Sequence, residues 1–159
     1  MKNHPETTVG HIHLTVSDLD RALTFYRDLL GFEISARYGD SAVFLSAGGY
    51  HHHIGLNTWS GKNATPSPEG HAGMYHVAFL YPNRKELARV LKHIIESGYP
   101  IDGAADHGVS EAIYLRDPDN NGVEIYVDRP KDTWKVSNDG MVEMITETLD
   151  FESLLREID

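Results

Sequence analysis

A strand, a helix and a closing glycine occur twice along the chain, and this repeat constrains the fold more than any other feature of the sequence. In residues 9–16 apolar and polar side chains alternate, which predicts a half-buried strand. Apolar residues at helical spacing follow from Leu19, and the stripe ends at Gly31, as at the end of a capped helix. The same order returns from Tyr75 to Gly98, so we expect two copies of one module.

Each copy continues with short strand-like runs that turn residues separate. In the first copy these runs are residues 32–35, 42–46 and 52–57. In the second copy the elements are a strand at 75–81, a helix at about 83–97, and strands at 112–116 and 122–127. The prediction is an α+β protein of two paired βαβββ modules in a single domain. Its expected parts are module one (about 8–59), a linker (about 60–73), module two (about 74–130) and a C-terminal tail (131–159).

The tail contains a further amphipathic segment. Asp150 precedes four apolar residues at helical spacing, which are Phe151, Leu154, Leu155 and Ile158. We expect a short helix whose apolar face packs on the body of the protein or on another subunit.

Composition and charge exclude several classes of function. The chain has no cysteine, so a metal could be held only by histidine and carboxylate side chains. A formal charge of −10 argues against nucleic acid and anionic membrane surfaces as partners. No apolar run has the length of a signal peptide or a membrane span, which predicts a cytoplasmic protein.

Two histidines stand at matching points of the repeat, and one glutamate lies on the matching face of the closing strand. His11 opens the first strand of module one, and His76 opens the first strand of module two. In the closing strand at 122–127 the apolar neighbours of Glu124 face the core, so Glu124 points to the opposite face. His13 shares a face with His11 and is a second candidate for a ligand or for a supporting residue. The set predicts a divalent metal site.

The chain resembles the vicinal oxygen chelate superfamily, which includes glyoxalase I, bleomycin-binding proteins and type I extradiol catechol dioxygenases. The motifs that carry the resemblance are His11-Ile12-His13-Leu14-Thr15-Val16-Ser17-Asp18-Leu19, then Ala22, Phe25-Tyr26 and Leu30-Gly31-Phe32, and Asp117-Pro118-Asp119 through Glu124. The resemblance covers about residues 8–130 and implies paired βαβββ modules that form a metal-binding cleft. It places His11, His76 and Glu124 on the metal positions.

Within this superfamily the chain is most similar to the extradiol dioxygenases. Glyoxalase-like members supply a further carboxylate near the end of module one, but residues 51–59 contain no Asp or Glu. The dioxygenases carry a histidine pair there, and the resemblance assigns the acid–base role to His53. It also matches His107 and Tyr114 to residues that hold the substrate by hydrogen bonds.

The implied function is ring cleavage of a small aromatic diol by dioxygen, with a metal held in the facial arrangement typical of non-haem iron. Fe(II) is the expected cofactor, with Mn(II) or Zn(II) as alternatives, and aromatic compound catabolism is the expected context. The alternative functions are a non-catalytic ligand-binding or resistance protein and a glyoxalase-like isomerase or lyase. A homodimer is the expected assembly.

Three consecutive histidines, at residues 51–53, stand at the start of the last predicted strand of module one. On a strand, His51 and His53 share one face and His52 points away. We therefore expect His53 to act in proton transfer, because imidazoles exchange protons near neutral pH. The pattern leaves open whether His51 lies in the same site, and it places His52 outside.

Overall fold

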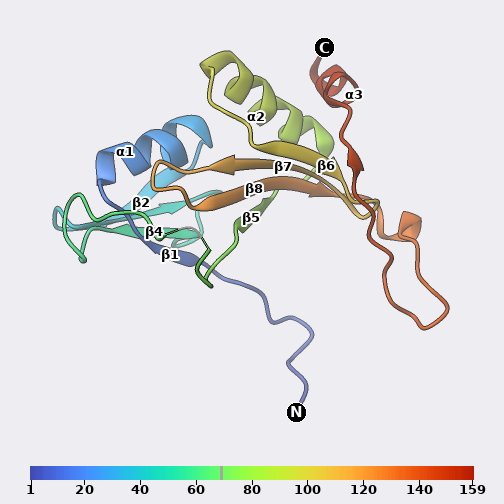
Figure 1. Cartoon of the computed structure of the whole chain (residues 1–159), viewed down its shortest axis with the longest axis horizontal. Helices are drawn as coiled ribbons and strands as arrows, with labels where there is room; N and C mark the ends of the chain where they lie inside the picture. Colours follow the sequence, from blue (N-terminus) through green and yellow to red (C-terminus); the bar gives the residue numbers. More distant parts are fainter. Residues whose placement is uncertain (69) are drawn as a thin grey trace. The chain divides into compact units, whose positions relative to one another are not determined.

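The structure is a computed structural model that describes residues 1–68 and 70–159; residue 69, in the predicted linker, lies outside the described residues. Contacts between Cα atoms divide the chain into two compact units, Met1–Ser67 and Pro68–Asp159. Each unit contains one sheet (Figure 1). None of the helices in the described ranges is long and apolar enough to span a membrane.

The first unit is a βαβββ module. Its sheet has the order β1-β4-β3-β2, and β1 pairs with β4 in parallel while the other neighbours are antiparallel. The elements are β1 (Ile12–Thr15), α1 (Leu19–Leu23), the π-helical turn η1 (Thr24–Leu29), β2 (Glu33–Tyr38), β3 (Ala42–Ser46) and β4 (Ile54–Asn57).

The second unit repeats this order and adds a C-terminal extension. Its sheet has the order β5-β8-β7-β6-β9, and β5 pairs with β8 in parallel. The module consists of β5 (Val77–Leu80), α2 (Arg84–Ser97), β6 (Gly103–Asp106), β7 (Ser110–Arg116) and β8 (Gly122–Asp128). The extension consists of η2 (Lys131–Thr133), β9 (Glu147–Thr148), α3 (Phe151–Leu155) and η3 (Arg156–Ile158). The predicted α+β class and the two βαβββ modules are confirmed.

The helices begin and end at the residues that the sequence signals indicated. The side chain of Asp18 accepts a hydrogen bond from the Arg21 amide at 2.8 Å, and Asn83 caps α2 in the same way. Gly98 ends α2 with φ of 69°, in the left-handed region that glycine adopts most easily. These caps explain why both predicted helices form at the expected places.

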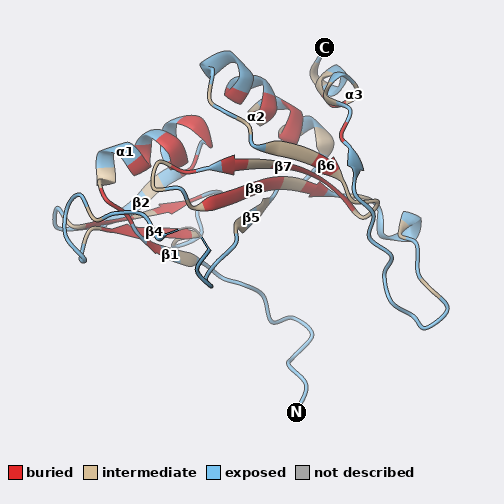
Figure 2. Ribbon diagram, viewed as in Figure 1, coloured by how far each residue is buried: buried red, intermediate tan, exposed pale blue. Residues whose placement is uncertain are grey.

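Apolar residues of each sheet and its helix form the buried core. Figure 2 shows the buried residues of the strands and helices in red. In the first unit Leu23, Phe25 and Tyr26 are almost fully buried. In the second unit the helix residues Leu91 and Ile94 are completely buried. One face of each sheet is therefore covered by its own helix, and the polar residues of the strands point to the other face.

The extension packs on the second unit itself. The Asp150 side chain accepts a hydrogen bond from the Ser153 amide at 2.9 Å and begins α3 at the predicted residue. Leu154 is completely buried, and α3 contacts α2, so the tail helix covers its own body. The extension also forms β9, which pairs with β6 through Ala105 and Asp106; neither of these two strands was predicted from the sequence.

Candidate functional site

His76 and Glu124 lie side by side in the second unit. His76 directly precedes β5 and Glu124 lies in β8, and the parallel pairing of the two strands sets Val77 beside Val123. His76 Nε2 is 2.9 Å from Glu124 Oε2. Glu124 is 9% exposed, and burial raises the pKa of its carboxyl group while His76 and His107 partly oppose that effect. The repeat thus brings two of the three predicted ligands together.

The spacing of these two atoms fits adjacent ligands of one metal ion. Donor atoms about 2.1 Å from a metal and at right angles to each other are about 3 Å apart. His76 Nδ1 is buried and has no hydrogen-bond partner among the described residues, so the ring lacks the second bond that usually orients a ligating histidine. Within the described ranges, no three histidine or acidic side chains gather as a ready-made metal site.

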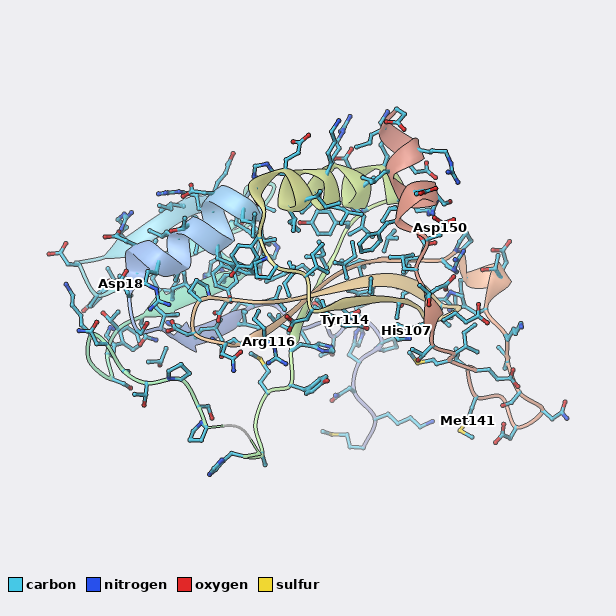
Figure 3. The ribbon with its side chains drawn as sticks, turned by 45° about the horizontal axis from the view of Figure 1, so that its top comes forward. Asp18, His107, Tyr114, Arg116, Met141 and Asp150 are labelled. Atoms are coloured by element: carbon cyan, nitrogen blue, oxygen red, sulfur yellow. The ribbon has the colours of Figure 1, made fainter. Side chains whose placement is uncertain are left out.

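Tyr114 and His107 form a second pair in the same unit (Figure 3). The Tyr114 hydroxyl is 2.7 Å from His107 Nε2, and the rings of Tyr114 and His76 are 6.0 Å apart. Burial, then the charges of Glu124 and Tyr75, raises the pKa of the Tyr114 hydroxyl. The hydroxyl therefore keeps its proton at neutral pH.

A cavity of about 320 Å³ opens beside these groups, a volume within the usual range for a small-molecule site. His76 and Tyr114 line it, together with Tyr75, Asp102 and Arg116. Arg116 Nε donates to Asp102 Oδ2 at 2.9 Å. Tyr75, Asp102 and Arg116 were not predicted as site residues, because no motif distinguishes them from surface residues.

In the first unit, the histidines occupy different places from those that strand alternation predicted. The triple histidine lies before β4, which begins at Ile54, so alternation does not order its side chains. The His52 ring lies 4.5 Å from the ring of His11, and His51 Nδ1 is 2.8 Å from His52 Nδ1. The prediction that His52 points away was wrong. Burial, then the neighbouring histidines, lowers the pKa of His52.

His53 is held by the chain that precedes it. The Ala47 amide donates to His53 Nδ1 at 3.2 Å, and the Ser46 hydroxyl is 3.3 Å from the same atom. Because an amide can only donate, Nδ1 accepts, and the neutral ring carries its proton on Nε2. His53 would need to release the Ala47 amide before Nδ1 could take up a proton.

The repeat also shows where a second metal-binding carboxylate would stand. Ile54 pairs with Ile12 as Val123 pairs with Val77, so Gly55 is the counterpart of Glu124. A Cβ atom at Gly55 would lie 2.9 Å from Cγ of His13. The His13 ring therefore occupies the space that a side chain at this position would need.

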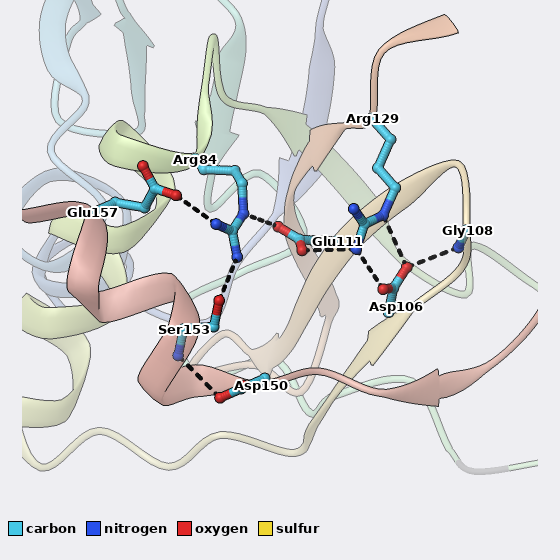
Figure 4. Close-up of polar contacts among 8 residues, drawn as sticks. All are labelled: Arg84, Asp106, Gly108, Glu111, Arg129, Asp150, Ser153 and Glu157. Atoms are coloured by element: carbon cyan, nitrogen blue, oxygen red, sulfur yellow. Dashed lines mark hydrogen bonds and ion pairs between the residues drawn. The ribbon is translucent and has the colours of Figure 1, made fainter. Parts of the chain in front are cut away.

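Four charged side chains hold the loop that carries His107 (Figure 4). Arg129 Nη2 is 2.5 Å from Asp106 Oδ2 and 3.0 Å from Glu111 Oε1. Arg84 Nε contacts the other oxygen of Glu111 at 2.6 Å. Glu111 is 3% exposed, so two arginines compensate one buried carboxylate.

The Asp106 contact predicts a pH-dependent contribution to stability. Its hydrogen bond with Arg129 lowers the pKa of Asp106 below the ordinary value, so the stabilisation is complete above about pH 4 and is lost as pH falls through the lowered native pKa. We expect Asp106→Asn to reduce the free energy of unfolding more at pH 7 than at pH 3, measured by urea denaturation. An equal loss at both values would contradict this contribution.

Comparison with known proteins identifies the family. Residues 8–125 match the Glyoxalase/Bleomycin resistance protein/Dioxygenase superfamily, and the chain belongs to it, as the vicinal oxygen chelate resemblance predicted. The chain is 41% identical over 155 residues to a catechol-2,3-dioxygenase of Bacillus subtilis, covering 97% of this chain and 53% of that protein. It is 28% identical over 121 residues to biphenyl-2,3-diol 1,2-dioxygenase 3 of Rhodococcus globerulus, covering 76% of this chain and 63% of that protein.

A solved structure has the same fold. The crystal structure of lactoylglutathione lyase from Agrobacterium tumefaciens matches with a TM-score of 0.60 and 23% identity, covering 78% of this chain and 96% of that chain. The chain spans about half the length of the Bacillus subtilis relative and under two thirds of the Rhodococcus one.

Proposed function

We propose that the chain is a ring-cleaving dioxygenase of the extradiol type that acts on a small aromatic diol. One observation carries the proposal: His76, which contacts Glu124, and Tyr114, which contacts His107, both line a cavity of small-molecule size. The similarity to two relatives named as dioxygenases of aromatic diols supports it.

His76, Glu124 and His11 are the proposed metal ligands, with Fe(II) as the proposed metal and Mn(II) or Zn(II) as alternatives. Two imidazoles and one carboxylate are the donor set of non-haem iron sites that leave positions open for substrate. These three residues would hold the metal, which when bound would supply a redox centre with open positions for the two oxygens of the diol. Tyr114 and His107 would orient the diol by hydrogen bonds.

Gly55 argues against a glyoxalase-like isomerase or lyase. It is the counterpart of Glu124 in the first unit, and it offers no carboxylate for a fourth ligand or a base. A non-catalytic binding protein would bind the diol without consuming oxygen, so a measurement of oxygen uptake distinguishes it from a dioxygenase.

Oxygen uptake tests the proposed function directly. Protein reconstituted with Fe(II) under nitrogen, then mixed with aerated catechol or 3-substituted catechols, is expected to consume one oxygen molecule per diol and to form a yellow ring-opened product. Binding of catechols without oxygen consumption across the panel would indicate a binding protein instead. Metal analysis of protein as purified separates Fe(II) from Mn(II) and Zn(II).

The proton-transfer role proposed for His53 has a competitor in His52. The resemblance assigns His53, whereas His52 is the histidine whose ring lies against His11. We expect His53→Ala to retain metal and to lower kcat by about 100-fold, within the usual range for loss of a general acid–base group. If His52→Ala lowers kcat and His53→Ala does not, the role belongs to His52. Steady-state oxygen uptake and metal content measure both effects.

The extension supports a homodimer as the proposed assembly. Residues 134–145 expose several apolar side chains that nothing in the described part of the second unit covers. These are Val136, Met141, Val142 and Met144. Sedimentation of the full chain is expected to show twice the monomer mass.

A further inference from the structure

The C-terminal extension contacts the proposed substrate-binding histidine directly. After η2 the chain forms a long loop and returns to the free edge of β6 (Figure 1). There the Ile145 amide donates to the His107 carbonyl at 3.1 Å, and His107 Nδ1 is 2.9 Å from the Ile145 carbonyl oxygen. Two reciprocal hydrogen bonds therefore join Ile145 to His107.

The second of these bonds determines which ring nitrogen of His107 carries the proton. A carbonyl oxygen only accepts, so Nδ1 must donate. The Thr146 hydroxyl is 3.5 Å from the same nitrogen, at the limit of a hydrogen bond, and competes poorly with the shorter contact. In the neutral ring Nε2 is then unprotonated and accepts from the Tyr114 hydroxyl, which lies 2.7 Å away.

We propose that Ile145 is a positioning residue: its carbonyl holds the proton of His107 on Nδ1, so the Tyr114 hydroxyl donates to His107 and turns its oxygen lone pairs to the cavity. The cavity wall then presents an acceptor at Tyr114. An acceptor favours a ligand that carries hydroxyl groups over one that presents a carbonyl oxygen. That the ligand is a diol rests on the proposed function.

The position of the Ile145 side chain depends on the absence of a side chain at Gly108. Gly108 has φ of +74°, and a Cβ atom there would lie 3.3 Å from Cγ1 of Ile145. The Gly108 amide also donates to Asp106, which Arg129 holds (Figure 4). Alanine at position 108 would therefore press on the Ile145 side chain at the point where the reciprocal bonds form.

The other end of the extension is anchored independently. Arg84 Nη1 contacts Glu157 at 2.5 Å, and Arg84 Nη2 is 3.5 Å from the Ser153 hydroxyl (Figure 4). The same arginine contacts Glu111, which Arg129 also binds. One ionic network therefore ties α3 and the His107 loop to the sheet, which limits the movement of Ile145 between them.

15N NMR of metal-free protein with labelled histidine measures the tautomer of His107 directly and requires no enzymatic activity. Two-bond 15N–1H correlations distinguish the two neutral tautomers, and His107→Gln assigns the signal. The parent is expected to show the Nδ1–H form at His107. The Nε2–H form in the parent would overturn the inference, whatever any variant shows.

Two glycine variants supply the matched comparison. Gly108→Ala is expected to shift His107 toward the Nε2–H form. Gly140 has similar backbone strain at φ of +83°, but no atom of the described residues lies within 4 Å of an added Cβ, so Gly140→Ala is expected to leave the tautomer unchanged. An unchanged tautomer in folded Gly108→Ala would overturn the role of Ile145.

Ligand binding provides the second readout. Under nitrogen, Fe(II)-loaded Gly108→Ala is expected to bind catechol about tenfold more weakly than Gly140→Ala, since one hydrogen bond to the diol is misdirected. Equal affinities would overturn the proposed direction of the Tyr114 hydroxyl. If the tautomer behaves as expected but no diol is oxidised, the proposed function fails while the positioning of His107 stands.

Discussion

Glu124→Gln is expected to abolish stable Fe(II) binding while the fold remains intact. Glutamine keeps the volume of the side chain but removes the charged oxygen that lies 2.9 Å from His76 Nε2. Removing a residue that only hydrogen-bonds to a metal ligand already weakens metal binding about 10–100-fold. Removing a ligand itself is therefore expected to weaken Fe(II) binding by more than about 100-fold. Isothermal titration with Fe(II) under nitrogen measures the change.

The stability of the metal-free variant gives an independent expectation. Burial raises the pKa of Glu124, which means that the folded protein disfavours its charge. A neutral glutamine avoids that cost, so the free energy of unfolding should be unchanged or higher. Asp128→Asn, an exposed change on the same strand, is the control and should bind Fe(II) as the parent does. Parent-like Fe(II) affinity in Glu124→Gln would remove Glu124 from the proposed ligand set.

Gly122→Ala is expected to destabilise the second unit and to displace His76. An added Cβ atom would lie 2.2 Å from the Tyr75 carbonyl oxygen and 3.0 Å from Cβ of His76. Both obstacles belong to the segment that leads into β5, so either this backbone moves or the β5–β8 pairing opens. We expect a loss of about 2–3 kcal/mol in the free energy of unfolding, typical of overpacking.

Gly103→Ala is the matched control for this substitution. Gly103 also lies in a strand of the second unit and, like Gly122, lines the cavity beside His76, but no atom in the described part of the chain lies within 4 Å of an added Cβ atom. Its free energy of unfolding should be unchanged or slightly higher, because alanine restricts the unfolded chain. Urea denaturation and Fe(II) titration of both variants provide the comparison. Equal stability of the two would contradict the close approach of β8 to His76.

The sequence predicted most of the fold because its signals are local. The caps at Asp18 and Asn83 and the glycine at position 98 each act within one helical turn, and the structure has both helices where these signals place them. Two strands escaped prediction. In β6 the sequence Gly-Ala-Ala-Asp has little strand propensity, and β9 has two residues, so pairing with neighbours determines both.

The candidate site was predictable where it follows the repeat. The repeat related His76 to His11, and strand alternation put Glu124 on the face that carries the histidines. The structure adds the parallel pairing of β5 with β8, which matches that of β1 with β4 and brings His76 beside Glu124. The histidines before β4 do not follow strand alternation, so their directions depend on tertiary contacts such as the one between His52 and His11. Ile145 was also unpredictable, because its contact with His107 is made by the backbone.

The parallel pairing of β5 with β8 has a consequence for the order of folding. Val77 and Val123 stand near opposite ends of their module, and α2, β6 and β7 lie between them in the sequence. Contacts between distant parts of a chain carry the largest loop-closure entropy and tend to form late. We therefore expect His76 and Glu124 to come together late in folding. In a partly folded chain the two side chains would lie apart. Tight metal binding is therefore expected only when the second unit is fully folded.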